Sequence, residues 1–181
     1  MRTLKSFKIF LIVFYLVYIV CLTRTFADES DTSGVTMHVP SICKLTINDS
    51  IQIMNLLQDA SGEAAYEAGH IDGENNKPAL IVDSNTGWKL SVKASFDWGI
   101  VDGYQKSTSD LQLKVVSNSG HQTGFTNFTP VSLNDQEIAS YSAGVGDDIY
   151  NGQYRILLDW TKDIPGAYFI IITYTLSTQS A

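Results

Sequence analysis

The clearest pattern in the chain is a strict alternation of apolar and polar residues from Trp88 to Phe96. Side chains of a β-strand point alternately to its two faces, so every second residue lies on the same face. One face of this segment is entirely apolar and carries Trp88, Leu90, Val92, Ala94 and Phe96. The alternation predicts a strand with one face on a core and the other in solvent.

Turn-forming residues and further apolar runs surround this strand. The apolar run 79–82 is followed by the segment 83–87, DSNTG, whose residue types favour turns, so a hairpin or a bend is expected there. Residues 50–77 indicate only a short helix or strand and then a long loop. Later in the chain, further strands are expected at 111–116, 125–133 and 138–141.

The segment from Val35 onward indicates an edge strand interrupted by proline. Val35, Met37 and Val39 alternate with polar residues, Pro40 follows, and the alternation resumes over 43–47. Proline has no N–H to donate to a neighbouring strand, so it is confined to sheet edges, strand starts and bulges. We therefore expect a single edge strand broken at Pro40.

The end of the chain predicts a β-hairpin. Four apolar residues share one face of a strand, residues 162–166 (KDIPG) supply a turn, and the second arm runs through 167–176. Residues 168–174 are apolar on both faces, which is typical of a strand inside a sheet pair or covered by a partner. The four residues of the first arm are Tyr154, Ile156, Leu158 and Trp160.

Several short strands joined by turns, without alternating strand and helix units, predict an all-β fold. We expect one antiparallel β-sandwich of the immunoglobulin-like type over residues 35–181, without an internal repeat. The core must hold this domain without a disulfide, because Cys21 lies in the N-terminal apolar run and leaves Cys43 alone. Cys43 is interpreted as a small packed hydrophobic residue.

The first 27 residues are typical of a secretory signal peptide. Basic residues precede the apolar run 9–22, and Thr25-Phe26-Ala27 offers small residues at a cleavage site. As a helix the run spans ~21 Å, short of a ~30 Å hydrocarbon core, although an uncleaved anchor remains the alternative. Residues 28–34 (DESDTSG) then form a flexible acidic leader.

Cleavage would leave a strongly acidic protein. It removes four of the 12 basic residues and no acid, so 8 basic side chains face 19 acidic ones, a formal charge of −11. Nucleic acids and anionic lipids attract clustered lysine and arginine. Neither nucleic acid nor, after cleavage, a membrane is therefore an expected partner.

Catalytic signatures are absent from the sequence. It has neither Gly-x-Ser-x-Gly nor His-Glu-x-x-His, and His38, His70 and His121 lie far apart along the chain. We therefore expect a non-catalytic protein without a cofactor. The sequons at Asn48 and Asn127 matter only if the host glycosylates exported proteins.

One acidic loop is a candidate calcium site. Its oxygen-bearing residues are Asp72, Glu74, Asn76 and Asp83, partly at the alternate spacing of a calcium-binding loop. Lys77 stands where such a loop requires glycine, so a plain polar loop is the competing interpretation.

The tryptophans offer a candidate surface for stacking a ligand. Trp88 and Trp160 lie on apolar strand faces, so core packing is expected for both. Trp98 follows Phe96-Asp97 beside a turn and is the one predicted to stack on a ligand.

Two separated segments resemble the WxL cell-surface domain of bacteria. They are Gly87-Trp88-Lys89-Leu90-Ser91-Val92 and, after Pro165-Gly166-Ala167-Tyr168, the run from Ile171 to Leu176, with Tyr174 in the place of the family's second tryptophan. The resemblance implies a non-catalytic β-rich domain held non-covalently on peptidoglycan, with Trp88 and Tyr174 in the motifs.

A second resemblance is to β-sandwich pilin-like subunits. The opening Val35-x-Met37-x-Val39-Pro40 and the closing Gly-x-Tyr strand carry it, and it implies self-assembly through strand donation. The sequence thus favours a secreted or cell-surface module that binds a cell-wall polymer or another surface protein. The alternatives are a filament subunit and, third, a secreted enzyme.

Overall fold

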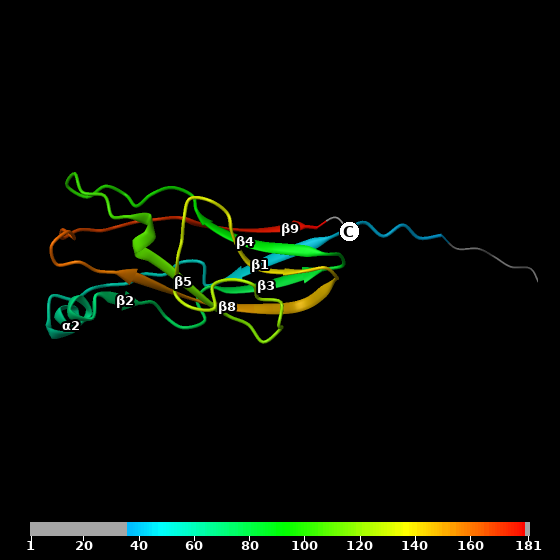
Figure 1. Ribbon diagram of the computed structural model, residues 1–181, viewed down its shortest axis with the longest axis horizontal. Helices are drawn as coiled ribbons and strands as arrows, with labels where there is room; N and C mark the ends of the chain where they lie inside the picture. The colour runs from blue at the N-terminus through cyan, green and yellow to red at the C-terminus, as the bar shows by residue number, and fades with distance from the viewer. Residues whose placement is uncertain (1–35, 180–181) are drawn as a thin grey trace, which may run out of the picture. The chain divides into compact units, whose positions relative to one another are not determined.

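The computed structural model describes residues 36–179 of the chain (Figure 1). The predicted signal peptide 1–27, the acidic leader 28–34 and Val35 lie outside the described residues. Contacts group the chain from Val39 onward into one compact unit. Its elements in order are β1 (Cys43–Asn48), α2 (Ala60–Ala68), β2 (His70–Asp72), β3 (Ala79–Ser84), β4 (Trp88–Ala94), the 3₁₀ turn η1 (Thr108–Asp110), β5 (Leu111–Val116), β6 (Thr129–Pro130), β7 (Gln136–Tyr141), β8 (Val145–Leu157) and β9 (Ile172–Thr178).

Two antiparallel sheets pack face to face, which confirms the predicted all-β sandwich. The larger sheet has the order β1-β3-β8-β5-β6, with β2 pairing on the far part of the long strand β8. The smaller sheet has the order β7-β4-β9. The ladders that join these strands are all antiparallel. Within residues 36–179, no helix has the length and apolar character that a membrane crossing requires.

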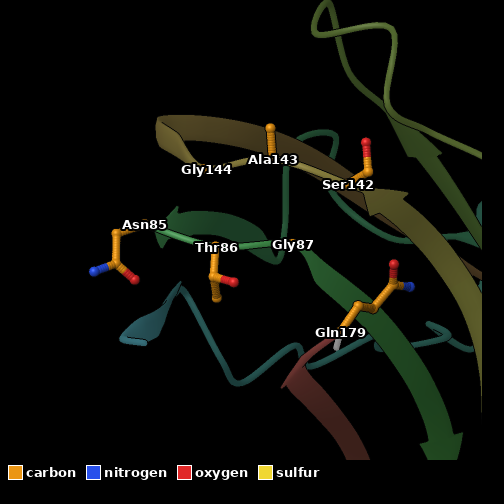
Figure 2. Close-up of a pocket in the computed structure, with 7 residues that line it drawn as sticks. All are labelled: Asn85, Thr86, Gly87, Ser142, Ala143, Gly144 and Gln179. Atoms are coloured by element: carbon orange, nitrogen blue, oxygen red, sulfur yellow. The ribbon is translucent and has the colours of Figure 1, made fainter. Parts of the chain in front are cut away.

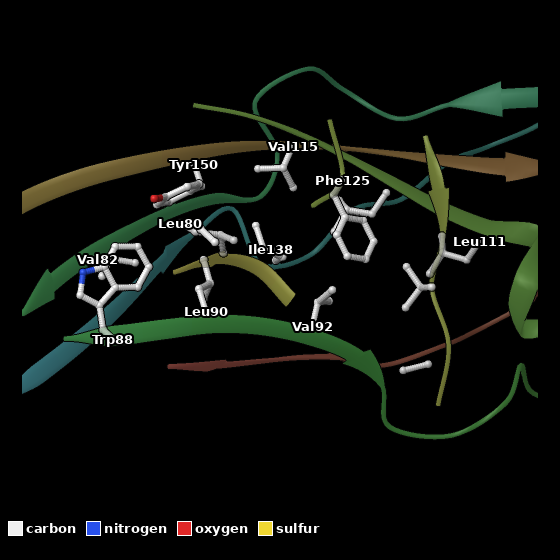
Figure 3. Close-up of a cluster of buried hydrophobic side chains, with 14 of the residues drawn as sticks. Leu80, Val82, Trp88, Leu90, Val92, Leu111, Val115, Phe125, Ile138 and Tyr150 are labelled. Carbon is white, nitrogen blue, oxygen red and sulfur yellow. The ribbon is translucent and has the colours of Figure 1, made fainter. Parts of the chain in front are cut away.

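The core lies between the sheets and follows the alternation seen in the sequence. The apolar face of β4 is fully buried, and Figure 3 shows its side chains pointing toward those of the larger sheet. β5 buries every second residue in the same way. The fully buried hydrophobic residues all lie between Leu80 and Tyr150, and the partly buried ones around them run from Leu45 to Leu176. Within residues 36–179 the core therefore extends from Leu45 to Leu176.

The predicted C-terminal hairpin is wrong, because its two arms belong to different sheets. β8 lies in the larger sheet and β9 in the smaller one, where it pairs with β4. Residues 158–171 cross from one sheet to the other instead of turning back on β8. Of the two alternatives expected for the segment 83–87, the bend is confirmed, since β3 pairs with β1 and β8 in the larger sheet and β4 lies in the smaller one.

The interrupted first strand is half confirmed. β1 is an edge strand of the larger sheet, but residues 36–42 form no strand. Asn85 holds the approach to β1, because its side chain accepts from the Ile42 N–H at 2.7 Å and donates to the Pro40 carbonyl at 2.8 Å. The expected strand at 125–133 reduces to β6, because Phe125 adopts a positive φ of 59° that breaks a strand.

Residues 50–77 contain one short helix with clear end signals. The Asp59 side chain accepts from the N–H groups of Ser61 and Gly62, as an N-cap residue does. Gly69 ends the helix with a φ of 72°, the left-handed conformation that glycine adopts without a steric penalty. The two caps place α2 beside β2 at the end of β8.

Alkaline pH is expected to weaken the fold, because two tyrosines between the sheets must stay neutral. The hydroxyls of Tyr154 and Tyr174 lie 2.7 Å apart. Burial raises the pKa of Tyr154 to about 12 and that of Tyr174 well above the ordinary 10. Their contribution is fully present below pH 10 and is lost as the pH rises toward 12, by up to about 1.4 kcal/mol per pH unit for each group.

Urea unfolding across this pH range measures the loss. The matched control is the double variant Tyr154→Phe/Tyr174→Phe, which lacks the two hydroxyls between the sheets and should show a shallower decline than the wild type, although Tyr104 and Tyr150, whose pKa values are also raised, still ionise. Equal slopes in the two proteins would contradict the assignment to this pair.

Candidate functional site

The aromatic residues that the sequence selects for binding belong to the core. Trp88 is 0% exposed and Trp98 4%, and Tyr174 packs against the core from β9. Trp98, the tryptophan that the sequence selects for ligand stacking, therefore packs inside the core of this structure. The Gly99 N–H donates to the Phe169 carbonyl at 2.9 Å, which continues the pairing of the β4 and β9 strands. Trp98 turns inward and meets Tyr168 edge-on, with ring centroids 6.5 Å apart.

The structure brings together the two motif segments that lie far apart in the sequence. They form the adjacent strands β4 and β9, with Leu90 opposite Leu176 and Val92 opposite Tyr174. Trp88 lies edge-on to Tyr150, with ring centroids 6.2 Å apart. Trp88 and Tyr174 thus pack from the smaller sheet against β8 of the larger sheet and are not exposed for binding in this structure.

The candidate calcium residues do not converge. Asp72 is held by Arg155 through two hydrogen bonds of 2.6 and 2.8 Å, which lower the pKa of its carboxyl. Glu74 pairs with Lys77 at 2.8 Å. Asp72 faces residue 155 of β8, whereas Val82, next to Asp83, faces residue 148, which separates them by roughly 20 Å at ~3.3 Å per residue. Among residues 36–179, no three His, Cys, Asp or Glu side chains are placed to hold a metal ion.

A hollow of about 350 Å³ lies where the three strands of the smaller sheet meet their loops. Figure 2 shows its lining, the short segments 85–87 and 142–144 with Gln179 beside them. Glycine is needed for this close approach, because a Cβ on Gly144 would lie 2.7 Å from the Ser84 carbonyl oxygen. The lining offers hydroxyl, amide and backbone groups and no ionisable side chain.

A buried polar cluster lies beside Trp88. The Asp148 carboxylate accepts a hydrogen bond from the Tyr150 hydroxyl at 2.7 Å and lies 2.9 Å from His121 Nδ1. The His121 ring stacks on Tyr141 at 3.9 Å between centroids. Burial, and then the hydrogen bond to Asp148, raise the pKa of Tyr150. The Ser119 hydroxyl contacts the Tyr150 hydroxyl and not the imidazole ring of His121, so the cluster is not arranged as a Ser-His-Asp triad. Its role is to supply hydrogen-bond partners to the buried Asp148 carboxylate.

An open groove of about 480 Å³ lies near the other ends of β4 and β5. Eight of its ten lining residues are polar, and the two apolar ones are Val131 and Leu133. The acidic side chain on its exposed wall is Asp97, to which Thr108 donates a hydrogen bond. The lining consists of Asp97, residues 105–109 and residues 131–134.

A buried ion pair fixes one wall of this groove. Lys106 is 4% exposed, and its Nζ lies 2.7 Å from the Asp163 carboxylate, itself 3% exposed, and 3.7 Å from Asp110. The Tyr104 hydroxyl donates to the same Asp163 oxygen at 3.2 Å. Burial, and then Asp163, raise the pKa of Tyr104 to about 12. The pair ties the groove to the crossover segment 158–171.

Large aromatic rings are exposed around the same end of the sandwich. Phe96 and Phe169 are both exposed and lie 5.7 Å apart between centroids. Trp160 is 62% exposed and stacks against Tyr66 of α2 at 4.4 Å. The core position expected for Trp160 is wrong, because β8 ends at Leu157 and the strand face does not reach it.

Sequence reasoning missed both the groove and the buried lysine. Residues 104–109 read as an ordinary polar loop (YQKSTS), and nothing in that string marks Lys106 as buried. Comparison of the chain with protein-family models finds no match, and a search of the curated proteins finds none.

Proposed function

We propose that this chain is an exported, non-catalytic surface module that binds a neutral, hydroxyl-rich polymer of the cell envelope. The groove of Asp97, residues 105–109 and residues 131–134 carries the proposal. Small-molecule pockets are lined mostly by apolar side chains, whereas this groove is open and offers hydroxyl, amide and carboxylate groups. Such a lining suits a chain of sugar hydroxyls, which exchange hydrogen bonds with water for hydrogen bonds with protein.

Charge favours a neutral glycan over a phosphate-rich polymer. The exported form would carry a formal charge of −11, and Asp97 is the exposed charged residue of the groove. A negative field repels polyanions and disfavours their approach. Peptidoglycan glycan strands fit this requirement. The resemblance to the WxL domain also supports a wall polymer as the ligand, because the two strands that carry its motif residues Trp88 and Tyr174 are paired with each other.

Co-sedimentation with purified peptidoglycan tests the proposal. The protein lacking residues 1–27 retains every core residue and is expected to pellet with the wall material. Removing one groove amide with Asn134→Ala should weaken binding about three- to tenfold, the range of a single hydrogen bond. Asn118→Ala, at another exposed asparagine outside the groove, is the matched control. A protein that stays in the supernatant at all wall concentrations would refute the proposal.

A filament subunit is the second candidate, and exposed apolar residues before β1 favour it. Met37 is 79% exposed and Val39 64%, and they alternate as donated strands do. β1 and β9 are edge strands that pair on one side only within residues 36–179. Unpaired edges accept strands from other chains. Electron microscopy of the protein-only control would show filaments if this second function holds.

A further inference from the structure

Trp160 is the exposed tryptophan of the described residues, and its exposure is built into the fold. β8 ends at Leu157, and the crossover segment then leaves the sheet, so Trp160 stands 62% exposed. Trp88 and Trp98, by contrast, are enclosed in the core. Exposure of a ring this large forgoes the burial of apolar area, about 25 cal/mol per Å².

The Trp160 ring packs against one aromatic neighbour and stays largely exposed. Tyr66 of α2 lies against it with centroids 4.4 Å apart and an interplanar angle of 32°. The caps at Asp59 and Gly69 fix both ends of α2, so the backing ring has a defined place. The arrangement is a pair of tilted aromatic rings in which Trp160 keeps 62% of its surface exposed.

The loop that carries Trp160 is held by a set of hydrogen bonds. The Asp159 carboxylate accepts from the Thr161 N–H at 2.9 Å and from its hydroxyl at 2.6 Å. Asp163 accepts from the Asp159 N–H at 3.0 Å and pairs with the buried Lys106. A site fixed before binding avoids the entropy cost of ordering its residues.

The chemistry around the platform favours a sugar ring as its occupant. A pyranose presents C–H groups on its flat faces, which pack on an aromatic ring, and hydroxyls at its rim. Asp159, Thr161 and Lys162 flank the tryptophan in the sequence. Their side chains bond to one another, and the carboxylate and the ammonium keep further acceptor and donor capacity for those hydroxyls. Anionic lipid is disfavoured by the acidic charge of the protein. The same Lys106 that anchors this loop also lines the polar groove.

We propose that Trp160, backed by Tyr66, is a stacking platform for one pyranose unit of a β-linked glycan. The assignment rests on the proposed function and names a contact outside the groove itself. It assigns one sugar unit of the polymer to Trp160 on the crossover segment.

Tryptophan fluorescence tests the platform with chitohexaose, a soluble β-linked N-acetylglucosamine oligomer, as the probe. Because Trp88 and Trp98 are buried, acrylamide quenching reports mainly on Trp160. Chitohexaose is expected to reduce that quenching, and the effect should disappear in Trp160→Phe. Unchanged quenching at saturating chitohexaose, or protection by lipid vesicles and not by the sugar, would overturn the proposal.

Peptidoglycan co-sedimentation separates this proposal from the function on which it rests. Trp160→Ala is expected to bind about tenfold more weakly, whereas Phe169→Ala, the matched exposed aromatic at 59% exposure, should bind as wild type does. Wild-type pelleting with an unchanged Trp160→Ala would overturn the platform and leave the proposed function intact. Failure of the wild type to pellet would overturn the proposed function first.

Discussion

Replacing Lys106 with methionine is expected to lower the free energy of unfolding by about 3–5 kcal/mol, the cost of removing one partner of a buried ion pair. The substitution leaves the Asp163 carboxylate, 3% exposed, without its 2.7 Å partner. Asp163 also organises the crossover segment, since it accepts hydrogen bonds from the Asp159 N–H and the Tyr104 hydroxyl. Urea unfolding of the protein lacking residues 1–27 measures the change.

Two variants distinguish this cost from a general effect of losing a lysine. Lys162→Met breaks the pair with Asp159 at 2.8 Å, but both side chains are exposed, so a much smaller loss of stability is expected. The double variant Lys106→Met/Asp163→Asn removes both charges, keeps an amide oxygen that can accept from the Asp159 N–H or the Tyr104 hydroxyl, and should recover part of the stability. A Lys106→Met protein as stable as Lys162→Met would contradict the buried-pair assignment.

The buried pair also shows why the site was hidden in the sequence. Strand positions follow from alternation, because burial on one face leaves a period of two that can be read directly. β4 and β5 were predictable on this basis. Lys106 and Asp163 lie in separate loops, and their pairing depends on how residues 97–110 fold back against 158–168. No local pattern encodes that contact.

Strand pairing failed for a related reason. The segments before and after residues 162–166 each have an apolar face. Two such strands can pair with each other as one hairpin, or they can lie in two different sheets that face each other. Local alternation is the same in both arrangements, so the choice between them rests on contacts far away in the chain. In this protein β9 pairs with β4, and that pairing unites two segments that the sequence could only place as separate strands.

The burial of Trp98 and Trp160 could not be predicted from the sequence, because strand ends are hard to locate. Trp160 continues the phase of Tyr154 and Ile156, which predicts burial if the strand extends that far. β8 stops three residues short of it. Trp98 follows a strand that ends at Ala94, but the backbone pairing of Gly99 with Phe169 carries its ring into the core. An error of a few residues in where a strand ends therefore reverses the predicted burial of the residues just beyond it.

Replacing Trp88 with alanine is expected to lower the free energy of unfolding by about 3–5 kcal/mol, the typical cost of a large buried aromatic residue. Trp88 is 0% exposed and packs edge-on against both Tyr150 and His121. Alanine would leave a cavity between the sheets at the point where β4 begins. Urea or thermal unfolding measures the loss, and Trp160→Ala, at an exposed site, is expected to cost less than about 1 kcal/mol.

Trp88→Phe then decides whether this residue packs the core or binds a ligand. Among the described residues the Trp88 Nε1 has no hydrogen-bond partner, so phenylalanine breaks no internal hydrogen bond and should cost only about 1–2 kcal/mol. If Trp88 acts through packing alone, Trp88→Phe keeps wild-type binding to peptidoglycan. Loss of binding with little loss of stability would instead make Trp88 a ligand contact, and would require the sandwich to open at this end.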